Sequence, residues 1–155
     1  MGLIECTSSA SLWRGYDYYK ARKVKNLKKI NDTQYTADVD GTMSEPYKVL
    51  IDVSHPRTSK CNCPHADGKR IICKHMIAVY FTAFPKEAQK IYDEYIACQE
   101  EEERREEELS DKICHYVWQM KKSEAQQALL ELLFDGPEWQ FEKFIREHYL
   151  DDEYY

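Results

Sequence analysis

Long apolar runs are missing from this sequence of 155 residues. No segment has the 18 or more apolar residues in a row that indicate a membrane-spanning helix. The first residues also lack a basic region followed by an apolar run, which is the pattern of a secretory signal. We therefore expect a soluble, cytoplasmic protein that makes no contact with a membrane, in a compartment that keeps its thiols reduced.

Catalytic motifs are missing as well. The sequence has no glycine-rich phosphate loop, no paired-carboxylate motif and no signature of a zinc deaminase. Cys63, Pro64 and His65 follow one another without the glutamate that zinc-hydroxide chemistry requires. We therefore expect a binding protein and not an enzyme.

Cysteine is present, but in a pattern that does not indicate a disulfide framework. Three of the six cysteines lie within fifteen residues together with a histidine, as Cys61, Cys63, Cys73 and His75. Three thiols and one imidazole supply the four ligands of a closed, tetrahedral Zn²⁺ site, which leaves no position for water. The remaining cysteines are scattered singly: Cys6, Cys98 and Cys114.

The grouping of these ligands in two pairs also fits a structural zinc ion. Cys61 and Cys63 would lie on one side of an extended segment, and Cys73 and His75 would lie where a helix begins. The intervening residues include Pro64 and Gly68 and allow the backbone to turn back. His65 is an alternative ligand that this pattern leaves open, although the pair at 73 and 75 fits better.

The order of the ligands, C-x-C followed after nine residues by C-x-H, resembles the SWIM-type zinc finger in a bacterial or phage-like, stand-alone form. The resemblance covers residues 9–84 and includes Trp13, a lysine-rich strand and a second strand before Cys61. Residues 122–133 also resemble a helical segment that follows the finger in such proteins. SWIM-type fingers serve transposases, chromatin-remodelling ATPases and recombination factors, so the resemblance implies binding of nucleic acid or of protein.

Apolar periodicity predicts an α+β fold for the first half. Leu12, Tyr16 and Tyr19 share one face of a helix that Ser9 or Ser11 could cap. Alternating apolar residues predict strands over 35–39 and 47–53, whereas residues 24–30 are ambiguous because lysines interrupt the pattern. We expect a small antiparallel β-meander that leads into a zinc-bound ββα finger, with residues 9–85 as one domain.

After His75 the apolar residues recur at helical spacing. One helix is predicted up to Pro85 and a second from Pro85 into the glutamate-rich residues 100–108. Ser110 and Ser123 are predicted to cap two more helices, and Gly136 and Pro137 to begin a last one. Residues 86–155 are thus predicted to form an α-helical extension, arranged as a hairpin or small bundle, with a frayed acidic end at 151–155.

Charge is divided unequally between the two halves. Residues 1–90 contain 15 Lys and Arg against 9 Asp and Glu, whereas residues 91–155 contain 7 against 19. A cluster of cations in the first half is suited to phosphate contacts. The predicted nucleic-acid-binding residues are Arg14, Arg22, Lys23, Lys25, Lys28, Lys29, Lys69, Arg70 and Lys74.

These observations predict a zinc-stabilised, non-catalytic module that associates with nucleic acid, DNA rather than RNA. The alternative is an acidic adaptor or inhibitor that docks on a basic protein, which would itself bind nucleic acid in some cases. If neither surface binds a partner, the lysines form an ordinary solvated face of the finger and the acidic residues form an ordinary solvated helix. The sequence leaves the partner and the oligomeric state open.

Overall fold

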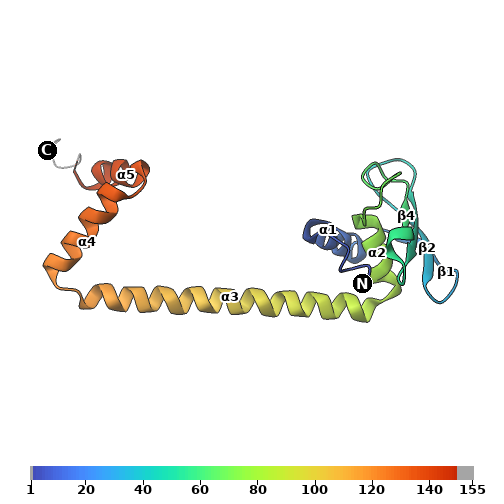
Figure 1. Ribbon diagram of the computed structural model, residues 1–155, viewed down its shortest axis with the longest axis horizontal. Coiled ribbons are helices and arrows are strands. Elements are labelled where there is room, and N and C mark those ends of the chain that lie inside the picture. Colours follow the sequence, from blue (N-terminus) through green and yellow to red (C-terminus); the bar gives the residue numbers. More distant parts are fainter. Residues whose placement is uncertain (1, 150–155) are drawn as a thin grey trace. The chain divides into compact units, whose positions relative to one another are not determined.

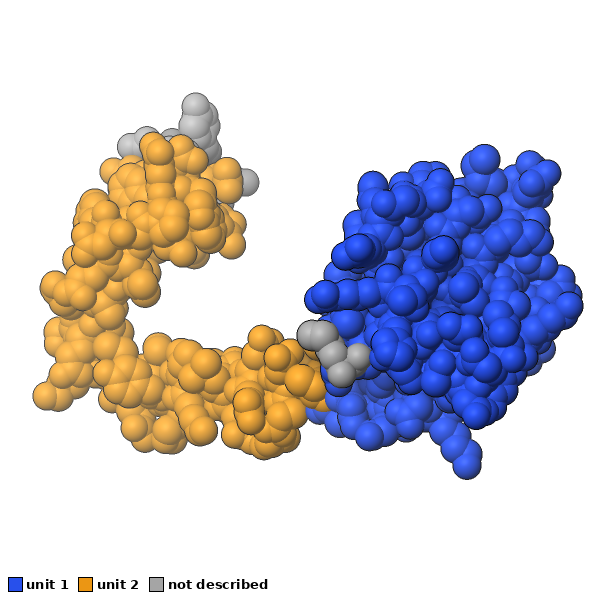
Figure 2. Space-filling model, turned by 45° about the vertical axis from the view of Figure 1, so that its right-hand side comes forward, with its two compact units in different colours: residues 1–97 blue, residues 98–155 orange. Residues whose placement is uncertain are grey.

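The computed structural model describes residues 2–149, and the predicted frayed end at 151–155 lies outside this range. The chain divides into two compact units, residues 1–97 and residues 98–155 (Figure 2). Unit 1 combines helices with an antiparallel sheet, and the described part of unit 2 is helical (Figure 1). The predicted α+β class, with a small meander followed by helices, is confirmed.

The sheet of unit 1 contains the strands in sequence order, β1-β2-β3-β4. Their bounds are Val24–Lys29, Gln34–Val39, Tyr47–Asp52 and Lys60–Cys61. All three pairings are antiparallel, and a short 3-10 helix, Pro56–Thr58, precedes β4. The meander therefore ends at the first predicted zinc ligand.

Strand β1 explains why residues 24–30 had no clear period. Its pairing with β2 shifts between Lys25 and Lys28, which marks a bulge. Asn26 in this bulge has φ 51° and donates a side-chain hydrogen bond of 2.8 Å to Asp38. An extra residue in a strand reverses the alternation of its side chains, so the period-two pattern is lost there.

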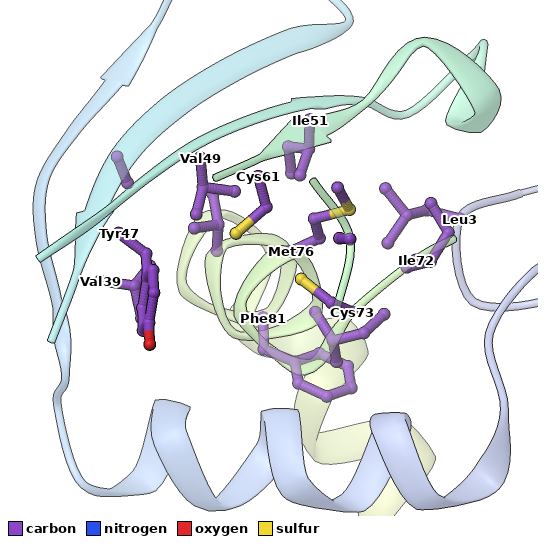
Figure 3. Close-up of a cluster of buried hydrophobic side chains, with 14 of the residues drawn as sticks. Leu3, Val39, Tyr47, Val49, Ile51, Cys61, Ile72, Cys73, Met76 and Phe81 are labelled. Atoms are coloured by element: carbon purple, nitrogen blue, oxygen red, sulfur yellow. The ribbon is translucent and has the colours of Figure 1, made fainter. Parts of the chain in front are cut away.

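Two helices lie on one face of this sheet. Helix α1 is Ser9–Lys20, capped by Ser8 and not by the predicted Ser9 or Ser11, and helix α2 is Lys74–Ala83. Helix α2 packs between the sheet and α1 (Figure 3). The two helices approach closely at Gly15, where an added Cβ would lie 2.5 Å from Cβ of Ile77.

The core of unit 1 fills the space between α2 and the sheet. Val39, Val49 and Ile51 point from the strands toward Met76 and Phe81 of α2, and all five side chains are buried. Figure 3 shows the sulfur atoms of the cysteines at 61 and 73 among these side chains. The predicted zinc ligands are therefore part of the hydrophobic core and not an appendage to it.

Helix α3 is longer than predicted and spans Pro85–Gln119 without a break at Ser110. Its first residues belong to unit 1, since Ala88 is buried and Tyr95 lies 4.2 Å from Trp13 between ring centroids. Residues 86–97, which the sequence had assigned to the helical extension, thus pack with the finger. Ser110 does not begin a helix because the preceding residues already continue the hydrogen-bonded turns of α3.

The helices of unit 2 continue with α4, Lys122–Asp135, and α5, Glu138–His148. Lys121 and not Ser123 occupies the cap position of α4, whereas α5 begins after Pro137 as predicted. No residue between 98 and 149 is buried, so this described part of unit 2 has no bundle core of the kind that the sequence predicted. Among the described helices, none is both long and apolar enough to cross a membrane.

Candidate metal centre

The four predicted ligands lie at the end of strand β4 and at the beginning of helix α2, and the packing of α2 against the sheet brings them together. Cys61 ends β4, Cys63 follows it in a turn, Cys73 is the N-cap residue of α2, and His75 lies in the first turn of α2. The turn after Cys63 is closed by backbone hydrogen bonds of 3.0 and 2.9 Å to its carbonyl oxygen. Gly68 in this turn has φ +67°, a left-handed conformation that glycine adopts without strain.

The ligand atoms have the spacing of a tetrahedral site. Three Sγ atoms and one imidazole nitrogen lie within 4.8 Å of one another. Nδ1 of His75 lies 3.7 Å from Sγ of Cys61 and 4.0 Å from Sγ of Cys73. Zn–S bonds of about 2.3 Å place tetrahedral ligands about 3.8 Å apart. The residues therefore fit a zinc ion without rearrangement of the backbone.

Burial of these four side chains favours a bound cation once the thiols are deprotonated. The exposed fractions of Cys61, Cys63, Cys73 and His75 are 4%, 2%, 1% and 3%. Thiolates cannot remain charged and unpaired in such an environment, because desolvation of an isolated charge is costly. A bound Zn²⁺ offsets this cost and closes the core at the same time.

The thiols also influence one another. A hydrogen bond from Cys61, together with His75, lowers the pKa of the Cys73 thiol to about 4. The same hydrogen bond and burial raise the pKa of Cys61, and burial raises that of Cys63. Cys73 is therefore the thiol that loses its proton most readily, and metal binding requires the thiolate form of all three cysteines.

Aromatic rings fix the orientation of the histidine ligand. The ring of Tyr47 is stacked on His75 at 4.4 Å between centroids, and Tyr18 contacts it edge-on at 5.3 Å. Nε2 of His75 is buried and has no hydrogen-bond partner among the described residues. Nδ1 is the nitrogen that faces the thiols. Because Nε2 makes no hydrogen bond with a described residue, packing of the aromatic rings holds the imidazole in place.

His65 does not take part in this cluster. It is exposed, and the metal-binding group consists of the other four residues. The alternative that His65 replaces one of the ligands is therefore not supported by the geometry.

Residues 47–84 match the model of the SWIM zinc finger family. This segment is similar to a SWIM zinc finger. The predicted resemblance is confirmed over residues 47–84, and the three cysteines and one histidine of this segment form a site suited to zinc. No curated protein and no solved structure matched the chain in the other two comparisons. A SWIM finger is a zinc-binding module of the kind that contacts nucleic acid or protein.

The predicted nucleic-acid-binding residues lie in several places on unit 1. Lys25, Lys28 and Lys29 are on β1, at the edge of the sheet opposite β4, and Lys29 forms an ion pair of 2.9 Å with Asp32. Arg22 is exposed in the turn before β1 and has φ 53°. The structure therefore does not unite all nine cations in one patch.

Tyr18 brings two of these cations together. Nζ of Lys23 and Nζ of Lys74 each lie 4.5 Å from the centroid of its ring. Lys74 and Arg14 also line a cavity of about 310 Å³ beside the zinc ligands, together with His65. This part of the finger presents positive charge and an aromatic ring close to the metal.

A larger hollow of about 740 Å³ lies over the face of the sheet that points away from α2. Lys69 and Arg70, which the sequence predicted, line it from the zinc-binding turn. Lys60, which the sequence places in the same cation cluster as Lys69 and Arg70, lines it as well, and the two cations of this hollow that the sequence did not indicate are Lys48 and Arg57. The register of β3 with β4, where Leu50 pairs with Lys60, places Lys60 on the face of Leu50 and Lys48, and Arg57 lines the same hollow from the 3-10 helix.

Proposed function

We propose that the SWIM finger is a non-catalytic, zinc-stabilised module that binds nucleic acid, and DNA in preference to RNA. The observation that supports this most is the cationic hollow on the outer face of the sheet. Within the described chain, four of its five cations form no ion pair, whereas Lys48 is paired with Asp38 at 2.7 Å. The unpaired cations are Arg57, Lys60, Lys69 and Arg70.

Unpaired cations around one concave surface are suited to a phosphate backbone. Phosphate contacts supply most of the affinity in complexes that lack sequence preference, because bound counterions are released. Asp67 is the one carboxylate that lines the hollow, so the local balance is strongly positive. Lys23 and Lys74, held over the ring of Tyr18, provide a second cationic contact for phosphate.

The zinc site supports a structural and not a catalytic role. Cys61, Cys63, Cys73 and His75 fill the four positions of a tetrahedral ion, and all four are buried. A catalytic zinc ion keeps one position open for water or substrate. The preference for DNA follows from the family resemblance, since transposases and recombination factors act on DNA. A cytoplasmic location is proposed because reduced thiols are needed for zinc binding.

The test compares two triple variants with the same change of charge. One variant carries Lys60→Glu, Lys69→Glu and Arg70→Glu in the hollow, and the other carries Lys25→Glu, Lys28→Glu and Lys29→Glu on β1. Binding to duplex DNA, single-stranded DNA and duplex RNA of equal length is measured by fluorescence anisotropy over a range of salt concentrations. The zinc content of each variant is the control for folding.

We expect the hollow variant to lose the larger part of the affinity for DNA. The slope of log affinity against log salt should become shallower by about 0.9 for each lost phosphate contact on a duplex. The β1 variant should bind within a few-fold of the unmodified chain. Absence of binding to any of the three nucleic acids at about 50 mM salt, where charge interactions are strong, would refute the proposal.

The acidic half supports the alternative function, contact with a basic protein. Residues 98–155 contain 17 Asp and Glu against 7 Lys and Arg. This charge repels nucleic acid and attracts a cationic surface. The two functions are compatible, because they use different units of the chain.

A further inference from the structure

The helices of unit 2 expose apolar side chains that no other described residue of this unit covers. On α3, the exposed fractions of Leu109, Ile113 and Tyr116 are 58%, 53% and 66%. On α4, Leu132 and Phe134 are exposed as well. Single exposed apolar residues are common on protein surfaces, but contiguous ones mark sites of interaction.

Three of the exposed apolar residues of α3 form a stripe together with two carboxylates. Leu109, Ile113 and Tyr116 have the spacing i, i+4 and i+7 and share one face of the helix. Glu102 and Glu106 precede Leu109 by seven and three residues, so they lie on the same face. We name these five residues the α3 stripe. Its apolar and acidic parts follow one another along the helix.

The carboxylates of the α3 stripe are not neutralised by neighbouring arginines. Arg104 forms ion pairs with Glu101 and Glu108, and Arg105 forms one with Glu101. Within the described residues Glu106 has no ion-pair partner, and Glu102 accepts only a hydrogen bond of 3.4 Å from Gln99. The acidic end of the stripe therefore remains available to an external cation.

Helix α4 repeats the combination of apolar and acidic groups. A hollow of about 500 Å³ on α4 is lined by Ala128 and Leu132 and by the carboxylates of Glu131 and Asp135. Neither carboxylate forms an ion pair in the described part of the chain, although Glu131 accepts a hydrogen bond of 2.9 Å from Gln127. Two separate helices of unit 2 thus offer an apolar surface beside unpaired negative charge.

A second copy of this chain is a poor occupant of the α3 stripe. Packing two such stripes together would bury Glu102 and Glu106 against carboxylates or against apolar side chains. Burial of unpaired carboxylates is costly, and neither stripe carries a cation that could pair with them. The excess of acidic residues in 98–155 adds long-range repulsion between copies.

We propose that the α3 stripe docks an amphipathic helix of a basic protein. When an amphipathic helix binds a partner, its contacting residues recur at positions i, i+3, i+4 and i+7, and the apolar residues of the α3 stripe have the matching spacing i, i+4 and i+7. Lysine or arginine residues at one end of the partner helix would pair with Glu102 and Glu106, and its apolar residues would cover Leu109, Ile113 and Tyr116. This surface deepens the alternative function, and its failure would leave nucleic-acid binding by the finger untouched.

The test uses the full, zinc-loaded chain and a synthetic helical peptide of 21 residues. The peptide has leucines at helical spacing along one face and lysines beside them, and a matched peptide has glutamate in place of every lysine. Fluorescence anisotropy of the labelled peptides measures binding. We expect the lysine peptide to bind and the glutamate peptide not to bind.

Two double variants separate the stripe from general acidity. E102Q/E106Q should weaken binding of the lysine peptide about tenfold, because two charge pairs at the interface are lost. E103Q/E107Q removes the same charge about 100° further around the helix and should change binding by less than about twofold. Ile113→Asn should weaken binding as strongly as E102Q/E106Q, and circular dichroism should show that α3 is intact in each variant.

Three outcomes would overturn the proposal. In the first outcome, the lysine peptide would fail to bind. In the second, E102Q/E106Q and E103Q/E107Q would weaken binding of the lysine peptide equally, which would indicate attraction to net charge alone. In the third outcome, sedimentation equilibrium would show self-association of the chain that Ile113→Asn abolishes, which would assign the stripe to a second copy.

Discussion

The two units of this chain reach ordered structure by different means. In unit 1, strands and helices that are far apart in the sequence enclose a common core, and four ligands for zinc lie inside it. In unit 2, helices form with no buried residue between positions 98 and 149. Unit 1 therefore depends on long-range contacts and metal, whereas unit 2 depends on local hydrogen bonds and on what covers its apolar side chains.

The largest expected effect is that of removing one zinc ligand. In Cys73→Ala the chain should lose its zinc, and the SWIM finger should unfold, because structural zinc contributes roughly 10–16 kcal/mol. Elemental analysis and a thermal melt check this, with His65→Ala as the matched variant that keeps its metal. A Cys73→Ala protein with one zinc per chain and an unchanged melting temperature would refute the assignment.

The second largest effect is expected when the same substitution, phenylalanine to alanine, is made in each of the two units and its cost in stability is compared. Phe81 is 0% exposed in the core of unit 1, whereas Phe134 in unit 2 is 70% exposed. Phe81→Ala should lower the free energy of unfolding of the finger by about 3–5 kcal/mol, since it removes contacts and leaves a cavity. Phe134→Ala should change it by less than about 0.5 kcal/mol. Urea unfolding of the zinc-loaded proteins measures both, and equal effects would contradict the contrast between the units.

Asp52 should show an intermediate effect. Its carboxylate accepts hydrogen bonds of 3.0 and 2.9 Å from the backbone N–H groups of Ser54 and His55 and one of 2.9 Å from Gln34. Asp52→Ala leaves these donors unpaired and should cost about 1–3 kcal/mol. The exposed Asp67 provides the control, and Asp67→Ala should have little effect.

The part of the effect of Asp52→Ala that comes from these hydrogen bonds should not depend on pH between pH 6 and 8, whereas the imidazole of His55, 3.8 Å from the carboxylate, adds an ion pair only when it is protonated. The hydrogen bond from Gln34, with those from His55 and Ser54, lowers the pKa of Asp52 below its usual value. A carboxylate with a lowered pKa contributes its full stability above the unfolded pKa of about 4 and loses it only as pH falls through the folded value. A cost that changed between pH 6 and 8 would show that another group is involved.

The smallest effect is expected for the arginine network of α3. Arg104 is paired with Glu101 and Glu108 on an exposed surface, where salt and water weaken ion pairs. Arg104→Gln should leave the melting of unit 1 unchanged and reduce the helical signal of the chain only at low salt. Arg146→Gln, at a position with no ion pair in the described chain, is the control. If Arg104→Gln reduced the helical signal at high salt as well, the network would stabilise α3 by more than its exposed ion pairs.

The zinc ligands were predictable because their signal is local. Cys61, Cys63, Cys73 and His75 lie within fifteen residues, and their order alone specifies the site. The strand over 47–53 was equally clear, since its side chains alternate between the core and the surface. Such features depend on neighbours in the sequence and not on the tertiary fold.

The remaining features depend on contacts that no local pattern contains. The bulge at Asn26 made the pattern of strand β1 ambiguous, and the cations Lys48, Arg57 and Lys60 meet only through the pairing of the sheet and the 3-10 helix before β4. The helix capped at Ser110 was a wrong prediction, because a serine within a helix resembles a cap until the neighbouring turns are known.

Residue-resolved hydrogen exchange before and after chelation of zinc tests most directly that metal stabilises unit 1 alone. Backbone amides of β3, Tyr47–Asp52, and of α2, Lys74–Ala83, should lose their protection when zinc is removed. Amides of residues 98–119 in α3 should exchange at the same rate with and without zinc. If both sets of amides lost protection together, or if the finger stayed protected without metal, the account of two differently stabilised units would be wrong.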